Sequence, residues 1–341
     1  MSDDAASSSW SGDVPEITAV VSTYRRPQFL AGLVAAFEAQ TLDRERFEVV
    51  LVDNGSGDET WERLSALVRA APFRARAVRL STNRGPGGGR NAGFAASRAP
   101  LVAITDDDCL PTPSWLEQVL VAFDAGADVV QGTVVPDDDG AVARRWWDHT
   151  VNITGPSPWF ETSNVAYRRS SLDAVGGFDE TDPLTAQLGG GRAFGEDAVL
   201  GARVVAAGAV RGWAGDAVVR HRIVPSTYRH QLQEWRNLRG FPGLVLRSHV
   251  GVESLYAGVF LNKETARFDL AVAGVLAAAV TRRPLFLLAG VPWARHRWYT
   301  IRERNPGRLE AIGRLAQRGL IEAVGFVSLV EGSIHHRKLV L

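Results

Sequence analysis

The chain has 341 residues, of which 45% are hydrophobic, so it can bury one large core or two modest ones and is not expected to be disordered. A single cysteine, Cys109, excludes an internal disulfide framework and a cysteine-based zinc site, and weakly favours a reducing compartment. The formal net charge of zero hides an asymmetry: residues 1–219 hold 19 Lys and Arg against 30 Asp and Glu, whereas residues 220–341 hold 19 against 8.

Strands and helices are expected to alternate over the first hundred residues. Continuous apolar and β-branched runs predict buried strands over 17–21, 47–52, 75–80 and 101–105. Apolar residues at helical spacing predict helices over 29–40 and 60–70, and a further helix opens over 90–97. Short connections between alternating elements predict an α/β fold with a doubly wound, mostly parallel sheet.

The second part of the chain predicts more widely spaced elements. Ser114 is expected to cap a helix. The later elements are predicted as a helix over 115–124, a strand over 129–135, a helix over 196–207 and a short strand over 218–221. We therefore expect a disordered leader over 1–14, a catalytic α/β domain over 15–231 and a basic helical extension over 232–341.

Residues 270–291 are the part of the sequence that could contact a membrane. Two apolar runs, 270–280 and 285–291, are separated by two arginines and a proline. Neither run reaches the roughly 18–20 residues that span a bilayer. Both an interfacial helical hairpin and an ordinary buried helical pair fit this pattern. The basic C-terminal part could face anionic lipid, nucleic acid or the acidic N-terminal part. Of these we expect an anionic membrane surface and no nucleic acid, with the protein cytoplasmic and peripheral on the inner face of the membrane.

Three consecutive aspartates, Asp106, Asp107 and Asp108, follow the fourth predicted strand directly. Carboxylates this close repel one another, so a cation or strong donors must meet their charge. Oxygen ligands suit Mg²⁺ or Mn²⁺, which commonly bind one or two carboxylates together with substrate phosphates. A solvated acidic loop is the plain alternative.

Polar residues also end two earlier strands, at Ser22–Tyr24 and Asp53–Asn54. In a parallel sheet these ends share one rim with the aspartates, and ligands bind along that rim. The glycine-rich segment 83–93 leads into a helix and could bring backbone N–H groups and Arg90 to a phosphate. It is neither a Walker loop nor a good dinucleotide fingerprint, and a simple turn would also explain it.

Further candidates lie later in the chain. Glu196–Asp197 stands at a helix start, where the dipole stabilises a carboxylate, although capping alone would explain it. His221 ends a predicted strand, and a lone histidine is more often structural than a ligand. Four aromatic residues could stack on a sugar face or simply fill the core. They are Trp146, Trp147, Trp159 and Phe160.

Together these motifs resemble glycosyltransferase family 2, whose fold is GT-A. The resemblance runs from about Ile17 to His221 and follows the order of the family's motifs. The matching segments are Val20–Arg26, Val52–Ser56, Asn83–Gly93, Asp106–Asp108, Ser163–Arg169, Gly176–Glu180, Gly195–Asp197 and His221. It implies a Rossmann-like sheet and a hexosyltransferase-type enzyme of polysaccharide or cell-wall biosynthesis.

The resemblance also implies roles for single residues. It implies that Asp197, beside Glu196, is the catalytic base, and that Asp106, Asp108 and His221 hold Mg²⁺ or Mn²⁺. The implied donor contacts are Thr23, Tyr24, Arg25, Asp53, Asn54, Gly85, Arg90, Asn91, Asp106 and Asp107. Because the aspartates are consecutive, Asp107 could replace Asp106 in the outer role, so the pair that binds metal stays open.

We therefore expect an inverting, metal-assisted transferase that moves one sugar from a UDP-, dTDP- or GDP-linked donor to a hydroxyl of a glycan, glycolipid or natural product. Gln233–Arg236 resembles the motif of processive synthases only loosely, which favours single-sugar transfer. A sugar nucleotidyltransferase is one alternative, although its glycine-rich loop would follow the first strand, where this chain has no glycine until Gly32. A non-catalytic, membrane-associated module with the same fold is another, although it would have no need of Asp108 and Asp197.

Overall fold

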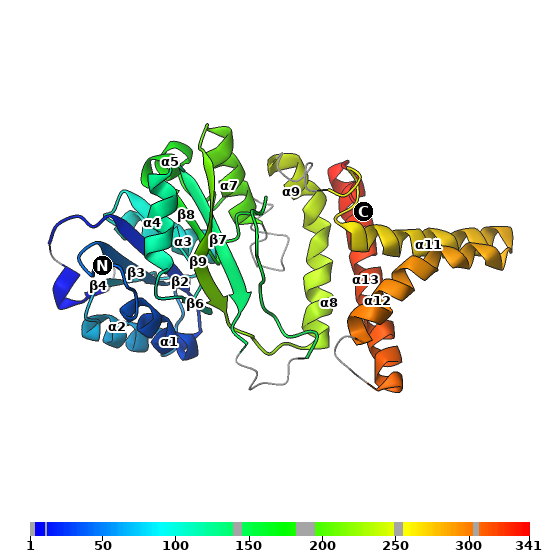
Figure 1. Ribbon diagram of the computed structural model, residues 1–341, viewed down its shortest axis with the longest axis horizontal. Coiled ribbons are helices and arrows are strands. Elements are labelled where there is room, and N and C mark those ends of the chain that lie inside the picture. The colour runs from blue at the N-terminus through cyan, green and yellow to red at the C-terminus, as the bar shows by residue number, and fades with distance from the viewer. Residues whose placement is uncertain (1–3, 11, 139–144, 182–194, 249–254, 303–306) are drawn as a thin grey trace. The chain divides into compact units, whose positions relative to one another are not determined.

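The computed structural model describes residues 4–10, 12–138, 145–181, 195–248, 255–302 and 307–341 (Figure 1). The chain divides into two compact units, which we call the N-terminal unit (1–225) and the C-terminal unit (226–341). The first is built on a sheet and the second is helical.

Nine strands in the described residues of the N-terminal unit form one mixed sheet in the order β1-β4-β3-β2-β5-β8-β7-β9-β6. Their bounds are β1 Asp4–Ala6, β2 Ile17–Thr23, β3 Phe47–Asp53, β4 Arg74–Arg79, β5 Leu101–Ile104, β6 Cys109–Pro111, β7 Val129–Pro136, β8 Val165–Arg168 and β9 Arg211–His221. Strands β4, β3, β2 and β5 pair in parallel, and so do β7 and β9. Strand β8 runs antiparallel to both of its neighbours and joins these two parallel groups.

Helices cover both faces of the sheet. Their bounds are α1 Pro27–Glu38, α2 Thr60–Ala70, α3 Gly85–Ala96, α4 Trp115–Asp124, α5 Arg169–Val175 and α7 Glu196–Ala206. Alternate residues of β2 enter different core clusters: Ala19 and Val21 pack with α1, α2 and α4, whereas Val20 packs with α3, α5 and α7. Successive strand residues point to opposite faces, so the two clusters are the two sides of a doubly wound sheet. The predicted fold class is therefore confirmed.

Several helix and strand boundaries differ from those predicted from the sequence. Helix α3 begins at Gly85, so the glycine-rich segment is mostly helix and not a loop before it. A side chain at Gly93 would meet Val20 Cγ1 at 2.3 Å, which shows that glycine lets α3 lie close against β2. Ser114 precedes α4 but its hydroxyl makes no cap hydrogen bond. Strand β9 is longer than predicted, and β6 and β8 were not predicted, because short strands leave little periodicity to detect.

The expectation of a disordered leader is wrong for residues 4–10. Strand β1 pairs antiparallel with β4, and Ala5 is buried in the core. The hydroxyl of Ser7 accepts a hydrogen bond from the Ala75 amide (3.0 Å), and the guanidinium of Arg98 lies 4.6 Å from the Trp10 ring centroid. A polar composition did not prevent order here, because the exposed edge of β4 supplies backbone partners.

The C-terminal unit is an assembly of helices. Their bounds are α8 Tyr228–Arg236, η2 Asn237–Gly240, α9 Phe241–Ser248, α11 Lys263–Thr281, η3 Pro284–Gly290, α12 Val291–Arg302 and α13 Arg308–His336. Helices α11 and η3 lie side by side and extend away from α13; we call this pair the arm (Figure 1). Among the described residues, no helix has both the length and the apolar character that crossing a membrane requires.

Candidate functional site

Three of the predicted segments meet at the carboxyl ends of β2, β3 and β5. Thr23 ends β2 and Asp53 ends β3, and the two are paired neighbours in the sheet. The Thr23 hydroxyl donates a hydrogen bond to Asp107 Oδ2 at 2.6 Å, which joins the segment after β5 to the same rim. The predicted convergence of strand ends therefore exists in the fold.

Asp107 is the most deeply embedded of the three aspartates. Besides Thr23, its carboxylate accepts a hydrogen bond from Arg26 Nη1 at 2.8 Å. Burial raises the pKa of Asp107 to about 6, against the opposing effect of Arg26 and with a further upward contribution from Asp108. Its oxygens are occupied by protein donors, which points to a role in positioning the Thr23–Arg26 segment.

Asp108 faces β9. Its Oδ1 lies 3.6 Å from Nε2 of His221, and its Oδ2 accepts a hydrogen bond from Arg26 Nη1 at 2.9 Å. The other ring nitrogen of His221, Nδ1, lies 2.8 Å from the Arg222 carbonyl oxygen. That carbonyl can only accept, so Nδ1 carries a proton and Nε2 is the ring nitrogen that faces Asp108. In its neutral form the ring then has the tautomer that a metal-binding histidine needs.

Asp108, Cys109 and His221 form a group whose potential ligand atoms lie within 4.8 Å of one another. Burial raises the pKa of the Cys109 thiol well above its usual range, which disfavours the thiolate that a metal would require. One carboxylate and one imidazole remain, a donor set that suits Mn²⁺ or Mg²⁺ with water and phosphate oxygens as further ligands. Asp106, which the resemblance placed in the metal set, is not a member of this group.

Asp106 belongs to a different contact. The buried guanidinium of Arg90 donates from Nη2 to Asp106 Oδ1 at 2.7 Å and from Nη1 to Glu196 Oε1 at 3.2 Å. Its charged plane also lies over Phe178, 5.7 Å from the ring centroid. Arg90 on α3 thus joins the acidic segment after β5 to the start of α7. The repulsion expected among the aspartates is met by two arginines, Arg26 and Arg90.

Asp197 follows Glu196 in the first turn of α7. Its carboxylate accepts the Ala198 amide at 2.9 Å. Burial raises the pKa of Asp197 well above its usual range, Glu196 raises it further, and Arg90 lowers it. A carboxylate whose pKa is raised in this way takes up a proton more readily than an ordinary aspartate, which suits a general base. Asp197 in turn adds to burial in raising the pKa of Tyr167, whose hydroxyl lacks a hydrogen-bond partner among the described residues.

The end of β3 has its own polar pocket. Asp53 is fully buried; its Oδ1 accepts the Ser56 amide at 3.0 Å, and its Oδ2 accepts no hydrogen bond from the described residues. The nearest cation is Arg79, with Nε at 3.8 Å. Arg25 sits opposite with a φ of 54°, held by bonds from its amide and Nε to Ser56. A strained arginine beside an unsatisfied buried acceptor is typical of a ligand site. Tyr24 is exposed beside it.

Three of the predicted donor contacts are used within the protein. The Asn54 side chain bonds the Gly85 carbonyl (2.8 Å) and the Arg84 amide (3.0 Å), which ties β3 to α3. Gly85 itself adopts a φ of 76°, which lets the chain turn into α3. The Asn91 side chain bonds both the amide and the carbonyl of Phe178. These bonds give Asn54, Gly85 and Asn91 a positioning role, and their contacts with the donor stay a prediction.

Two other sequence inferences need correction. Phe160 is buried and packs against Gly201, where a side chain would meet its ring at 2.1 Å, so it is a core residue and not a sugar platform. Arg26, which touches two aspartates, was not singled out. The sequence did contain a signal for it, because the basic pair Arg25–Arg26 follows β2 at the same rim as the three aspartates. Nothing in the sequence placed Tyr167 beside Asp197.

Residues 18–178 match the family model described as Glycosyl transferase family 2. This part of the chain belongs to glycosyltransferase family 2. The succinoglycan biosynthesis protein ExoO of Rhizobium meliloti is 35% identical over 162 residues, covering 46% of this chain and 44% of that protein. An undecaprenyl-phosphate 4-deoxy-4-formamido-L-arabinose transferase of Pseudomonas aeruginosa is 32% identical over 166 residues, 47% of this chain and 49% of that one. The chain thus spans about half the length of these relatives.

A solved structure resembles nearly the whole chain. It is the mannosyltransferase PcManGT from Pyrobaculum calidifontis, described as a complex with GDP-Man and Mn²⁺. The TM-score is 0.57 at 16% identity, over 94% of this chain and 87% of that protein. At this identity the similarity establishes the GT-A fold, with a helical region after it, and nothing about substrates.

Proposed function

We propose that this protein is an inverting glycosyltransferase that transfers one sugar from a nucleoside-diphosphate sugar to a hydroxyl acceptor. The observation that carries the proposal is the contact of Arg90 with both Asp106 and Glu196. It brings the acidic segment after β5 and the proposed base at the start of α7 to one place. A donor and an acceptor held on either side of that bridge would react there.

The surroundings of each residue at the rim suggest which part of the donor it binds. Asp53 and Arg25 are suited to the nucleoside, because Asp53 Oδ2 is a buried acceptor without a donor. Asp108 and His221 would hold the divalent ion. Such an ion, when bound, neutralises charge on the leaving diphosphate. Arg26 stands at the same rim and would be able to meet a phosphate oxygen of the donor.

Asp197 is the group we propose as the base. The acceptor hydroxyl donates its proton to the Asp197 carboxylate while its oxygen attacks the anomeric carbon. The bond to the leaving diphosphate breaks on the opposite side, which inverts the configuration. Arg90 keeps Glu196 and Asp106 in place and opposes the rise that burial causes in the pKa of Asp197, which favours the ionised form that a base needs. General-base assistance contributes roughly 10²–10⁴-fold to rate.

The acceptor and the location of the protein in the cell are also part of the proposal. We propose a hydroxyl on a glycan, glycolipid or natural product, and a peripheral position at the inner face of a membrane. Support comes from charge, since residues 226–341 hold 17 Lys and Arg against 8 Asp and Glu. A basic balance of this size favours an anionic surface.

The test is a panel of UDP-, GDP- and dTDP-sugars assayed for hydrolysis and transfer with and without Mn²⁺. We expect Asp197→Asn to lower turnover about 10²–10⁴-fold while the Kd of the donor stays near that of the wild type. Asp173→Asn, at an exposed carboxylate of α5, is the matched control. A variant Asp197→Asn that keeps most of its rate would remove the assigned base, and release of pyrophosphate from a nucleoside triphosphate would identify a nucleotidyltransferase instead.

A further inference from the structure

The arm leaves a large apolar surface without a cover in the described chain. Side chains on both of its helices are exposed, among them Val280 (84%), Leu285 (71%) and Leu288 (61%). Of the two arrangements that the sequence left open, the exposure of these side chains favours the interfacial hairpin over the buried helical pair. Gly274 explains how the helices come so close: a side chain there would meet the Phe286 carbonyl oxygen at 2.5 Å.

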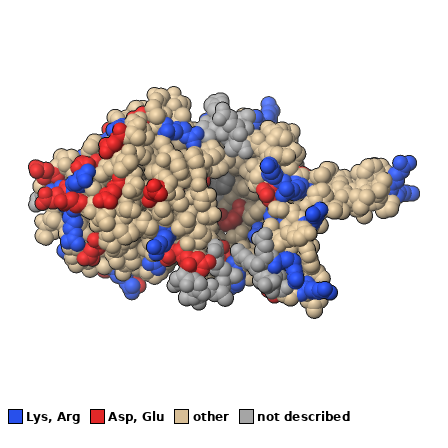
Figure 2. Space-filling model, in the orientation of Figure 1, with Lys and Arg blue, Asp and Glu red and all other residues tan. Residues whose placement is uncertain are grey.

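The acids of the arm, Glu264 and Asp269, lie in the first part of α11, and the charge beyond them has one sign. From residue 270 to residue 302 the sequence contains five arginines and no aspartate or glutamate. Two of the arginines, Arg282 and Arg283, stand at the turn between α11 and η3, and Figure 2 shows basic side chains at the outer end of the arm and a neutral surface along it. Two aromatic residues able to lie at a lipid headgroup boundary follow in α12, Trp298 and Tyr299.

A groove runs along one side of α11. Its volume is about 640 Å³. Its lining includes Lys263, Arg267, Leu270, Ala273 and Leu276, which recur on one face of the helix. At 1.5 Å per residue this face is about 20 Å long. The basic residues lie at the start of α11 and the apolar ones follow them along the helix. One end of the groove is therefore cationic, and the rest of this wall is apolar. Tyr256, Phe260 and Phe326 add aromatic walls.

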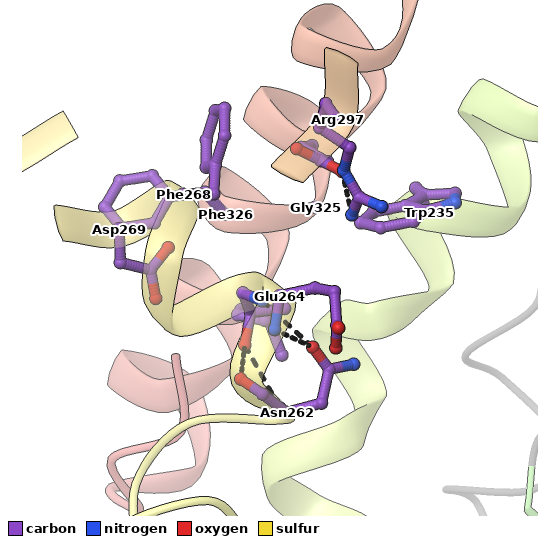
Figure 3. Close-up of a pocket in the computed structure, with 11 residues that line it drawn as sticks. Trp235, Asn262, Glu264, Phe268, Asp269, Arg297, Gly325 and Phe326 are labelled. Carbon is purple, nitrogen blue, oxygen red and sulfur yellow. Dashed lines mark hydrogen bonds and ion pairs between the residues drawn. The ribbon is translucent and has the colours of Figure 1, made fainter. Parts of the chain in front are cut away.

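One acidic residue, Asp269, also lines the groove, on the side shared with a smaller cavity of about 170 Å³ (Figure 3). In that cavity Glu322 pairs with Arg297 and accepts a hydrogen bond from Trp293. Asn262 caps the start of α11 through bonds from the Glu264 and Thr265 amides, both 2.9 Å. Arg297 and Glu322 of the smaller cavity are thus engaged with each other, whereas the groove is open and its long wall is apolar.

We propose that the arm docks on an anionic phospholipid bilayer and that the groove takes one acyl chain, with the phosphate of that lipid at Lys263 and Arg267. The groove is long enough for a chain of one leaflet, which is about 15 Å thick. Apolar side chains of η3 enter the headgroup boundary while Arg282 and Arg283 reach phosphates along its surface. This inference deepens the proposed membrane location but rests on the C-terminal unit alone.

A second copy of the chain is the competing occupant, and charge argues against it. A two-fold interface places the same patch on both sides, so arginines of one arm would meet arginines of the other. No acid lies in the stretch 270–302 to compensate them. Lipid phosphates supply that compensation directly.

The first experiment is cosedimentation of the full chain with vesicles of phosphatidylglycerol and phosphatidylcholine in equal parts, or of phosphatidylcholine alone. We expect binding to the anionic vesicles at low salt and release at high salt. Arg282→Glu with Arg283→Glu should weaken it at least tenfold, since each basic residue near the surface contributes about fivefold. Arg229→Glu with Arg308→Glu reverses two exposed arginines outside the stretch and should weaken it clearly less.

Two further pairs of variants separate the apolar contacts. Leu285→Gln with Leu288→Gln should weaken vesicle binding about tenfold or more, whereas Leu309→Gln, at a leucine 87% exposed on α13, should not. Ala273→Trp should abolish binding of lysophosphatidylglycerol, supplied below its micelle concentration, by filling the groove. Ala279→Trp, at an exposed alanine of the same helix that does not line the groove, should leave that binding intact.

Equal binding to both kinds of vesicle would overturn the proposal, and so would unchanged binding of the Ala273→Trp variant. A dimer in solution that Leu285→Gln and Leu288→Gln dissociate, without vesicle binding, would assign the arm to a second copy. The donor-hydrolysis rate of all these variants should equal that of the wild type. A protein that binds lipid but transfers no sugar, or the reverse, therefore tells the two proposals apart.

Discussion

The two units use arginine and apolar side chains in opposite ways. In the N-terminal unit Arg26 and Arg90 are held by carboxylates of the rim, and apolar residues such as Leu33 are fully buried. In the arm of the C-terminal unit, Arg283 lies in a stretch without acids and Leu285 faces solvent. The first unit compensates its charge and apolar surface internally, as a preorganised site requires. The arm of the second unit leaves Arg283 and Leu285 for the lipid surface that we propose.

The strongest test of this comparison is to change the proposed metal-ligand pair of the N-terminal unit, Asp108 and His221. We expect Asp108→Asn to lower kcat/KM by at least about 100-fold, since even residues that only support metal ligands contribute 10–100-fold. The same variant should lose Mn²⁺-dependent binding of nucleoside diphosphate in calorimetry. Cys109→Ala is the control within the same group of side chains, and we expect its activity to stay within a few-fold. Equal losses in the two variants would show a packing defect and not a ligand.

The second prediction concerns the bridge. Arg90→Lys keeps the charge, but a single ammonium cannot hold Asp106 and Glu196 as two ends of one guanidinium do. We expect kcat to fall about 10–100-fold with the KM of the donor little changed, because the bridge positions groups without contacting the nucleoside.

Arg84→Lys provides the matched control for the bridge, since Arg84 makes a bidentate pair with Glu180 at the surface. We expect it to stay within a few-fold of the wild type. A larger change in KM than in kcat for Arg90→Lys would instead place this arginine on the donor diphosphate, as the resemblance implied.

The features that could be predicted from the sequence are those that depend on residues close together along the chain. Buried parallel strands and the order of the motifs are local signals, and they placed Thr23, Asp53 and Asp106–Asp108 on one rim. The division of the aspartates among Arg90, Arg26 and His221 depends on side chains that are distant in sequence and close only after folding. For the same reason the hydrogen bonds between the Asn91 side chain and the Phe178 backbone could not be predicted, although the resemblance implied a contact of Asn91 with the sugar donor. Edge pairing of β1 likewise depends on β4, seventy residues later.

The third prediction compares apolar burial in the two units directly. Leu33→Ala removes a fully buried side chain from α1 and should lower the free energy of unfolding by about 2–5 kcal/mol. Leu285→Ala shortens an exposed side chain and should change it by no more than about 0.5 kcal/mol. Chemical denaturation followed by circular dichroism measures both. A destabilisation by Leu285→Ala close to that of Leu33→Ala would mean that the arm is covered in solution by another part of the protein or by a second copy.

The smallest expected effect compares two carboxyl groups with a pKa of about 6, Asp107 in the N-terminal unit and Asp269 in the C-terminal unit. Burial is the main cause for both, and each pKa lies above its ordinary value of 3.8. The folded state therefore favours the protonated form, and the stability that this provides below pH 4 is lost as pH rises through 6.

Asparagine cannot ionise, so the free energy of unfolding of Asp107→Asn should rise relative to the wild type between pH 4 and pH 7. The rise should be at most about 3 kcal/mol, the equivalent of a shift of roughly two pKa units. Asp269→Asn should show the same sign and less than half the size, because Asp269 is only partly buried and water screens its charge. Urea denaturation at a series of pH values gives both slopes. Equal slopes would mean that Asp269 is as deeply enclosed as Asp107, and the contrast between an internally compensated rim and an open groove would then not hold.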